Sequence, residues 1–201
     1  MFYQLSIATI QETISKAKEK SDIDIYPYWA VAEQESVYCP LWNTFNTIWT
    51  GEGGLGSRIY NVLDTMLQQY KNVIIIGSDS PQITFQYIVD AVHVLAEGTE
   101  DGVIGPCEDG GFVLFGSKTP IAKQLWTDIE YSKETTLYQL TKKLDKNKFT
   151  YSCLPKMGDV DHYDDLKNLY PILKANRNDN LPKQNELITW LETDIIQWQS
   201  S

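Results

Sequence analysis

Arginine is scarce in this sequence, and acidic residues outnumber basic ones. Among 201 residues there are two arginines, Arg58 and Arg177, and the formal net charge is −10 at pH 7. A protein that follows the phosphates of DNA or RNA needs a surface of lysine and arginine, so this composition argues against a nucleic-acid partner. An anionic ligand would need a metal ion to offset the charge of the protein.

Cysteines and long apolar runs are scarce as well. Cys39, Cys107 and Cys153 are widely spaced and form no CxxC pair. This spacing argues against a disulfide framework and against a zinc site, so we expect buried thiols in a reducing compartment. No run approaches the roughly 18 apolar residues that a membrane span needs, and the N-terminus shows no signal pattern. These absences predict a cytoplasmic protein with no membrane partner.

The patterning that is present predicts one α/β domain with a helical tail. With 42% hydrophobic residues, the chain is long enough to bury one core of ordinary size. Apolar periodicity predicts helices at 5–20, 59–67, 83–95, 136–144, 162–173 and 182–198, and strands at 22–31, 46–50, 73–76, 103–104, 112–115 and 149–154. We expect residues 1–173 to form the domain, and residues 174–201 to form a linker and an amphipathic helix packed on it. A homodimer contact is the alternative role of that helix.

The strand expected at residues 73–76 organises the rest of the chain. Its four β-branched residues do not alternate with polar ones, which is typical of a strand buried on both faces of a parallel sheet. The turn formers Gly77, Ser78 and Asp79 follow it, so Asp79 lies at the carboxyl edge, where open α/β sheets bind ligands. A carboxylate there suits Mg²⁺ or Mn²⁺. Capping of the next helix explains Asp79 equally well.

A glycine-rich segment, residues 51–58, precedes the expected helix at 59–67. Its sequence is Gly-Glu-Gly-Gly-Leu-Gly-Ser-Arg. Glycines let backbone N–H groups approach a ligand closely, and a loop that opens onto a helix N-terminus suits an anion or the edge of a base. The spacing matches neither the dinucleotide-binding nor the P-loop motif. A flexible connector with Ser57 as N-cap is therefore an equal alternative.

Two further acidic turns follow expected strands. Glu108 and Asp109 lie between the strands at 103–104 and 112–115. They form either a solvated turn or a site in which Asp109 faces the same pocket as Asp79 and acts as a base or metal contact. The last turn, residues 158–166, reads GDVDHYDDL, and Asp161 there can cap the helix that begins at 162.

In order, the segments GEGGLGSR, IIIGSDSP, GPCEDGGFVLFG and GDVDHYDDL resemble the DUF2064 family of glycosyltransferase-like proteins, which belongs to the nucleotide-diphospho-sugar transferase (GT-A) superfamily. The similarity runs from about residue 3 to Tyr170. It implies a three-layer α/β/α sandwich with a mostly parallel, mixed central sheet. The chain departs from the family at residues 1–20, where nothing matches the usual first apolar strand and its PGxxKTRL phosphate loop.

The resemblance also implies roles for individual residues. The implied metal ligands for Mg²⁺ or Mn²⁺ are Asp79 and Asp161, and the implied catalytic residue, which orients or deprotonates the acceptor, is Asp109. The implied nucleotide-binding residues are Gly53, Gly54, Gly56, Arg58 and Ser78. Two positions depart from the family pattern, because Gly54 replaces an aspartate, and His162 and Tyr163 replace threonine and proline.

Three functions remain open at this point. The acidic turns favour a metal-dependent transferase that uses a nucleotide-sugar donor and a small-molecule acceptor. Nucleotidyl transfer from a nucleotide donor would use the metal ion in the same way. The lack of a match to the phosphate loop favours instead a non-catalytic binding or assembly module on the same scaffold.

Overall fold

This computed structural model describes residues 2–158, 160, 165–175 and 180–199, the last six of these by their backbone alone. In chain order the elements are α1 (Phe2–Lys20), β1 (Tyr28–Val31), the 3-10 helices η1 (Gln34–Ser36) and η2 (Pro40–Trp42), β2 (Asn46–Trp49), α2 (Leu55–Leu67), β3 (Val73–Ile76), α3 (Phe85–Glu97), β4 (Gly102–Pro106), β5 (Phe112–Ser117), α4 (Lys123–Thr127), α5 (Thr136–Lys146), β6 (Tyr151–Cys153), α6 (Asp165–Ala175) and α7 (Pro182–Gln199). The predicted helices and strands are all found, with shifted ends.

The strands form two separate sheets. One has four strands in the order β3-β5-β4-β6, with β5 antiparallel to both neighbours and β4 parallel to β6. The other has two parallel strands, β1 and β2. Since β3 and β4 both run opposite to β5, the strands β3, β4 and β6 share one direction. The predicted mixed α/β class is confirmed.

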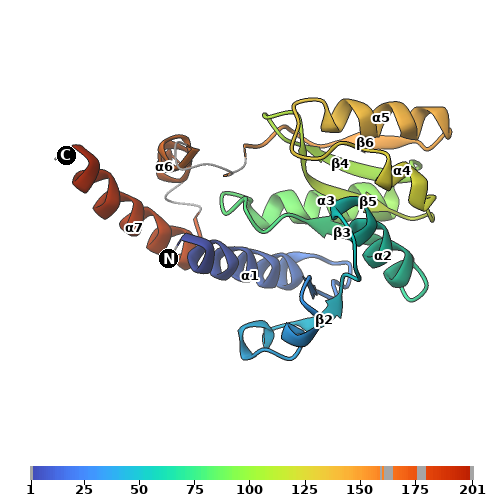
Figure 1. Cartoon of the computed structure of the whole chain (residues 1–201). Helices are drawn as coiled ribbons and strands as arrows, with labels where there is room; N and C mark the ends of the chain where they lie inside the picture. The colour runs from blue at the N-terminus through green and yellow to red at the C-terminus, as the bar shows by residue number, and fades with distance from the viewer. Residues whose placement is uncertain (1, 159, 161–164, 176–179, 200–201) are drawn as a thin grey trace.

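Helices cover both faces of the strands (Figure 1). One apolar cluster includes Ile7 and Ile10 of α1 with Ile88 and Leu95 of α3. A second cluster lies among α2, α4 and α5, and the fully buried Trp126 packs edge-on against Phe115 of β5 at a centroid distance of 4.8 Å. The three-layer α/β/α arrangement expected from the resemblance is thus present.

The prediction that residues 73–76 form a strand buried on both sides is wrong. β3 is an edge strand of the four-stranded sheet, and the side chains of Ile74, Ile75 and Ile76 are only partly buried. The reason is non-local, because β3 pairs with β5 on one edge only, and no described strand pairs with its other edge. β3 therefore has the composition of a central strand but lies at the edge of the sheet.

The prediction of buried thiols is only partly correct. Cys107 is buried, whereas Cys39 and Cys153 are exposed, and no disulfide joins the three. Cys39 precedes η2 in a surface connection and Cys153 ends the edge strand β6, so neither lies under a covering layer. Among the described helices, none is long and apolar enough to cross a membrane.

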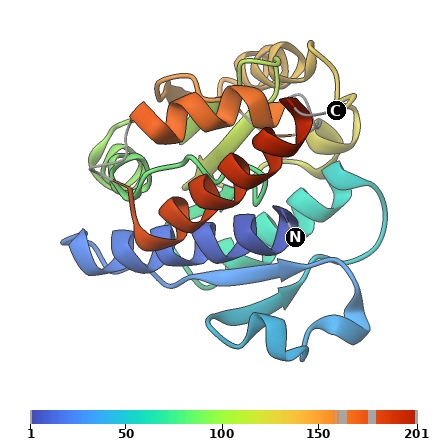
Figure 2. The same ribbon diagram turned by 90° about the vertical axis from the view of Figure 1, so that its left-hand side faces the viewer.

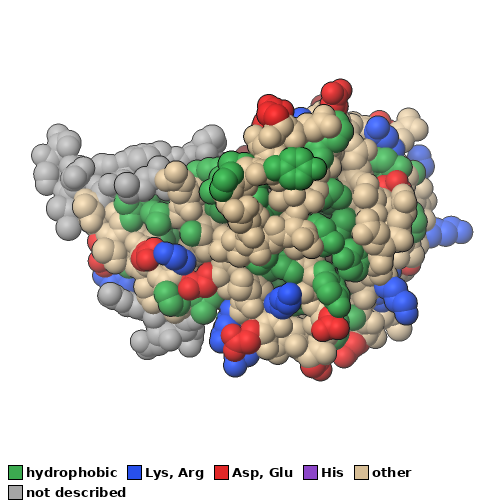
Figure 3. Space-filling view, turned by 90° about the horizontal axis from the view of Figure 1, so that it is seen from below, with side chains coloured by type: hydrophobic (Ala, Val, Ile, Leu, Met, Phe, Trp, Pro, Cys, Tyr) green, Lys and Arg blue, Asp and Glu red, His purple; other side chains and the backbone are tan. Residues whose placement is uncertain are grey.

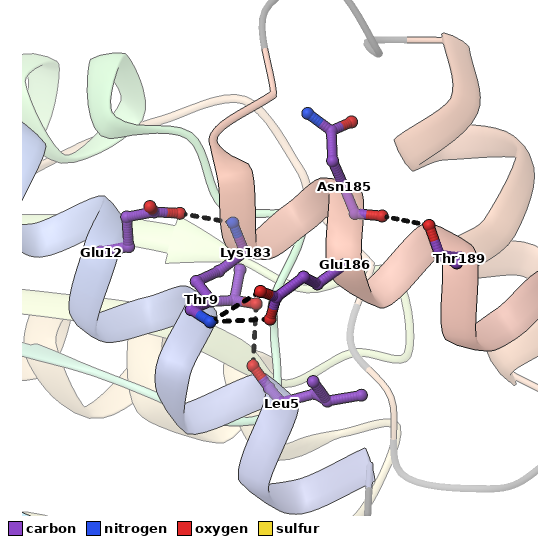
Figure 4. Close-up of polar contacts among 7 residues, drawn as sticks. All are labelled: Leu5, Thr9, Glu12, Lys183, Asn185, Glu186 and Thr189. Carbon is purple, nitrogen blue, oxygen red and sulfur yellow. Dashed lines mark hydrogen bonds and ion pairs between the residues drawn. The ribbon is translucent and has the colours of Figure 1, made fainter.

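The C-terminal helix α7 lies against α1 and α6 (Figure 2). A third apolar cluster joins α6 and α7 through Leu169, Leu173, Leu187 and Leu191. At the start of α7, the backbone N–H of Lys183 donates to Glu12 Oε2 of α1 at 2.7 Å (Figure 4). The tail helix is thereby tied to the first helix by both polar and apolar contacts.

Gln184 links α7 to the turn after β3. Its side chain is buried, and its Nε2 donates to the carbonyl oxygens of Pro81 and Ile83 at 3.0 and 3.3 Å. We expect Gln184→Met, which keeps the volume but not these bonds, to lower the free energy of unfolding by about 2–3 kcal/mol. The melting temperature, followed by circular dichroism, should fall by about 4–10 °C.

Thr189→Val is the matched control for that change. The Thr189 hydroxyl is exposed and donates only to the Asn185 carbonyl within α7 (Figure 4). Its loss should cost less than about 0.5 kcal/mol. Equal melting temperatures for the two variants would contradict an anchoring role of Gln184.

Candidate functional site

The turns that follow β3 and β4 and the segment after β6 meet at the carboxyl edge of the four-stranded sheet. The backbone N–H of Glu108 donates to the carbonyl of Met157 at 3.0 Å, and Gln82 Nε2 donates to the Gly158 carbonyl. Cys107 and Met157 also form an isolated parallel bridge. Segments far apart in the sequence are therefore neighbours here, as the shared direction of β3, β4 and β6 requires.

Asp79 lies in the first of these turns and is exposed. Its Oδ1 is 2.7 Å from the place that a Cβ on residue 77 would occupy, so the carboxylate folds back over Gly77. The carbonyl of Ser78 accepts a hydrogen bond of 2.6 Å from Ser6 Oγ of α1. The backbone of this turn is thus held by the first helix while the Asp79 carboxylate lies at the surface.

Asp109 lies in the second turn and is also exposed. Its Oδ1 accepts the backbone N–H of Gly111 at 2.8 Å, which closes the turn. Gly110 has a φ of +91°, and its carbonyl accepts the N–H of Leu137 in α5 at 2.8 Å. Asp109 therefore shapes its own turn, and α5 fixes the position of that turn at the sheet edge.

Two polar groups behind these turns were missed by sequence reasoning. Ser80 Oγ and Gln82 Oε1 are buried, and neither has a hydrogen-bond partner in the described part of the chain. Buried polar atoms without a partner are costly and often mark a site for water or a ligand. The only signal in the sequence was their position within three residues of Asp79, in the segment that leads to α3.

Tyr87 of α3 holds the segment that follows β6 in place. Its hydroxyl donates to the Pro155 carbonyl at 3.0 Å, two residues before Met157. Burial, and secondarily the nearby Cys107 and Cys153 thiols, raise the pKa of the Tyr87 phenol to about 12. The hydroxyl is therefore a neutral donor throughout the physiological range, and it holds the segment that leads to Gly158.

The glycine-rich loop lies at the carboxyl ends of β1 and β2, ahead of α2. Gly51 and Gly53 have φ values of +77° and +100°, and the N-cap residue Gly54 provides no side-chain cap for α2. Gly56 is needed for packing, because a Cβ there would lie 2.2 Å from the Trp126 carbonyl oxygen. Gly53 and Gly54 are exposed, so among the predicted glycines these two border solvent.

Arg58 holds this loop together. Its Nε donates to the Gly53 carbonyl at 3.0 Å, and its Nη1 donates to the Ala32 carbonyl at 3.0 Å and to Thr50 Oγ1 at 2.8 Å. These partners follow β1 and β2, so the guanidinium joins the ends of the two strands to α2. Sequence reasoning identified the residue but did not detect this internal role.

The two sheets present their carboxyl edges on the same side. Tyr28, at the start of β1, shares a hydrogen bond of 2.9 Å with Tyr70, which lies just before β3. The strands that begin together therefore end together, and the glycine-rich loop and the Asp79 turn lie on one edge. Asp161, the second predicted metal ligand, lies outside the described residues. Among those that are described, no three His, Cys, Asp or Glu side chains form a metal cluster.

This edge combines oxygen donors with backbone amides. The carboxylates of Asp79 and Asp109 suit a hard cation, and the uncapped N-terminus of α2 suits an anion. The protein is acidic, and Arg58 is engaged with the loop, so a bound phosphate would depend on a cation and on backbone N–H groups. The arrangement can hold a metal-bound anionic ligand and place it next to a carboxylate.

The mixed sheet between helices matches solved structures with a nucleotide-diphospho-sugar transferase-like fold. One similar solved structure is provisionally named a nucleotide-diphospho-sugar transferase from Desulfovibrio desulfuricans, with a TM-score of 0.79, 20% identity, and coverage of 98% of this chain and 85% of that one. CMP:2-keto-3-deoxy-manno-octonic acid synthetase in complex with CTP is also similar, with a TM-score of 0.57, 9% identity, and coverage of 85% and 88%. At these identities the likeness shows the fold.

The chain belongs to DUF2064, described as an uncharacterised protein family conserved in bacteria, whose sequence profile matches residues 13–133. This confirms the resemblance to that family over residues 13–133, while the segment GDVDHYDDL lies outside the match, and the similar solved structure supports the GT-A-like relationship. The matched region includes the glycine-rich loop, the Asp79 turn and the Asp109 turn. No curated protein matches the sequence.

Proposed function

We propose that the protein is a metal-dependent transferase that takes a nucleotide-sugar donor and a small-molecule acceptor, and that it works in the cytoplasm. The observation that carries this proposal is the meeting of the segments around Asp79, Asp109 and Gly158 at the carboxyl edge of strands that run in one direction. Such an edge is the usual ligand site of open α/β sheets. The fold shared with two nucleotide-related proteins supports a nucleotide-type donor.

The residues present fit a divalent cation. Asp79 supplies an exposed carboxylate, and the buried Ser80 Oγ and Gln82 Oε1 are oxygen atoms without a described partner in the same turn. Asp79, together with Asp161, would hold Mg²⁺ or Mn²⁺. The cation, when bound, would stabilise negative charge that develops on the departing phosphate.

Other residues would bind and orient the substrates. The exposed backbone at Gly53 and Gly54 can approach the nucleotide, while Arg58 keeps the loop in place rather than contacting phosphate directly. The Ser78 backbone is fixed by α1 beneath the same ligand. Asp109 would accept a hydrogen bond or a proton from the acceptor hydroxyl, because its carboxylate is at the edge where that hydroxyl would lie.

Asp79→Asn tests the proposal. We expect the variant to bind nucleotide sugars in the presence of Mn²⁺ about 10–100-fold more weakly than the parent, since one charge-assisted contact is worth about 1.5–3 kcal/mol. Isothermal calorimetry against a panel of nucleotide sugars and triphosphates measures this. The fold should persist, because the Asp79 side chain is exposed.

Asp90→Asn is the matched control, because Asp90 is an exposed carboxylate on α3 that accepts a bond from Gln86 in its own helix. The Asp90→Asn variant should bind nucleotide sugars in the presence of Mn²⁺ as tightly as the parent does. Unchanged affinity in Asp79→Asn would contradict the role of Asp79 as a metal ligand. If no nucleotide binds to the parent with Mn²⁺, the transferase proposal fails.

Nucleotidyl transfer is the second candidate, because the chain shares its fold with a synthetase whose structure contains CTP. Triphosphates in the same panel separate the two, since a nucleotidyltransferase would bind CTP or another triphosphate and release pyrophosphate. Binding without turnover of any donor would favour a non-catalytic module. The internal use of Arg58 is the observation that supports this last reading.

A further inference from the structure

Polar side chains are buried beneath the turn that carries Asp79. Of the nine Ser, Thr and Gln side chains that are buried in the described chain, six come from α1, from this turn and from α7: Ser6, Thr9, Thr13, Ser80, Gln82 and Gln184. Apolar side chains are not scarce, because several reach the surface on the lower face of the molecule (Figure 3). Buried polar groups are costly unless they are hydrogen-bonded, so the bonds of this layer must explain it.

Gln184 of α7 holds the turn on both sides of Gln82. Its Nε2 donates to the carbonyls of Pro81 and Ile83, and its Oε1 accepts the backbone N–H of Leu181 at 3.0 Å. Both ends of this buried carboxamide are therefore engaged. The backbone that flanks Gln82 is fixed from α7, and the direction of the Gln82 side chain is fixed with it.

Gln82 extends this constraint to the segment that follows β6. Its Nε2 donates to the Gly158 carbonyl, and because a carbonyl can only accept, the amide nitrogen of Gln82 rather than its oxygen must face Gly158. The oxygen, Oε1, is buried and has no partner in the described part of the chain. The side chain thus leaves one of its own polar atoms unsatisfied while it holds Gly158.

The segment after β6 is held from two further directions. Val160 is buried in the third apolar cluster together with Leu187 of α7. Gly158 lies between two side chains, since a Cβ there would be 3.9 Å from Gln82 Nε2 and 4.0 Å from Glu108 Oε2. The position of this segment is therefore set by α7 and by the turns that follow β3 and β4.

These contacts form a closed ring. The ring runs from Gln184 of α7 to the Asp79 turn, through Gln82 to the segment after β6, and back to α7 through Val160. Asp161 follows Val160 directly in the sequence. The ring therefore joins the segments that carry the two predicted metal ligands without using either carboxylate.

We propose that Gln82 is a positioning residue, which acts through Gly158 and together with α7 sets the separation of the Asp79 and Asp161 segments. This inference rests on the proposed function, because it concerns the cation that these two carboxylates would share. Two carboxylates bind one cation tightly only where the surrounding contacts hold both at the required distance. Because α7 lies beyond residues 13–133, the part of the ring that it supplies is outside the match to the family.

Gln82→Met tests the proposal, because it approximately keeps the volume and removes the amide that holds Gly158. We expect the full-length variant to bind Mn²⁺ about tenfold more weakly or worse than the parent, with Mn²⁺ alone or with the nucleotide panel. Electron paramagnetic resonance of free Mn²⁺ measures this. In the ligand-free chain, the amides of residues 156–158 should exchange faster in the variant, since their segment loses the bond to the Asp79 turn.

Ser117→Ala is the matched control for a buried polar side chain. The Ser117 hydroxyl is buried and donates to the Thr119 carbonyl at 2.6 Å. Ser117 pairs with Val73 at the start of β3, so it lies at the opposite end of that strand from Asp79. Its loss should lower the melting temperature while Mn²⁺ affinity stays within about twofold of the parent.

Gln184→Met provides a second variant, which acts from α7 and is informative even if Gln82→Met does not fold. Its Mn²⁺ affinity should fall by about threefold or more, because the backbone on both sides of Gln82 is released. Since both residues act on one ring, the double variant should bind no more than about twofold more weakly than Gln82→Met. Losses that multiply in the double variant would contradict the ring.

Two results would overturn the inference and leave the proposed function standing. The first is equal Mn²⁺ affinity in Gln82→Met and the parent. The second is an equal loss of affinity in Ser117→Ala, which would trace the effect to general destabilisation. A parent that binds no Mn²⁺, alone or with any nucleotide, would instead contradict the proposed function itself, and the role of Gln82 at a metal site would be wrong with it.

Discussion

Gly110→Ala should lower the free energy of unfolding by about 4 kcal/mol or more, and the melting temperature by about 8–16 °C. Two causes act together. Gly110 has a φ of +91°, which a residue with a side chain rarely adopts, and a Cβ there would lie 2.0 Å from the backbone carbonyl oxygen of Glu134. A backbone atom cannot rotate away as a side chain can, so the turn itself must move.

Movement of this turn would reach the candidate site. The Gly110 carbonyl accepts the N–H of Leu137, and this bond holds the first turn of α5 against the segment that contains Asp109. If the variant is soluble and partly folded, donor turnover should therefore decrease along with stability. Thermal denaturation by calorimetry measures the main effect, and exchange of amides in residues 107–111 shows its location.

Gly111→Ala provides the control for that substitution. A Cβ on Gly111 would lie 3.1 Å from the Asp109 carboxylate, which is exposed and can move. Gly111→Ala should lower the free energy of unfolding by no more than about 1 kcal/mol. If Gly110→Ala and Gly111→Ala had similar melting temperatures, the close approach of Glu134 would not be the constraint inferred here.

The local elements were predictable because local patterns determine them. Periodicity predicted α3, α5 and the strand pair around Asp109, and the buried faces of these elements agree with it. The strand expected at 22–31 is shorter in the structure and begins at Tyr28, directly after Pro27, which cannot donate to a ladder. Strand order was not predictable in this way, since the edge position of β3 depends on which other strands are present.

The candidate site was predictable to the level of turns but not of contacts. Parallel strands bring their carboxyl ends together, so the meeting of the Asp79 and Asp109 turns at one sheet edge follows from the strand directions. The roles of Arg58 and Gly56 depend on Ala32 and Trp126, which are distant in sequence and become neighbours only through folding. A search for motifs therefore assigns such residues to ligand binding, although their contacts are with other residues of the protein.

Arg58→Ala is the second substitution with a large expected effect. The guanidinium makes three hydrogen bonds, to the Gly53 carbonyl, the Ala32 carbonyl and Thr50 Oγ1, and these join β1, β2 and the glycine-rich loop to α2. Since hydrogen bonds to a charged group contribute about 1.5–3 kcal/mol each and the site is partly exposed, we expect a loss of about 3–4 kcal/mol in unfolding free energy. Urea denaturation followed by tryptophan fluorescence measures it.

Two comparison variants separate an internal role of Arg58 from phosphate binding. Arg58→Lys keeps the charge but cannot reach three partners in one plane, so it should recover less than half of the lost stability. Lys123→Ala removes an exposed cation that lies over the Tyr60 ring, and should cost less than about 1 kcal/mol. If Arg58→Ala kept full stability and lost nucleotide affinity, the guanidinium would be a phosphate ligand. If stability falls and the amides of residues 50–54 exchange faster in Arg58→Ala than in the parent, Arg58 acts by shaping the loop that we propose as part of the nucleotide site.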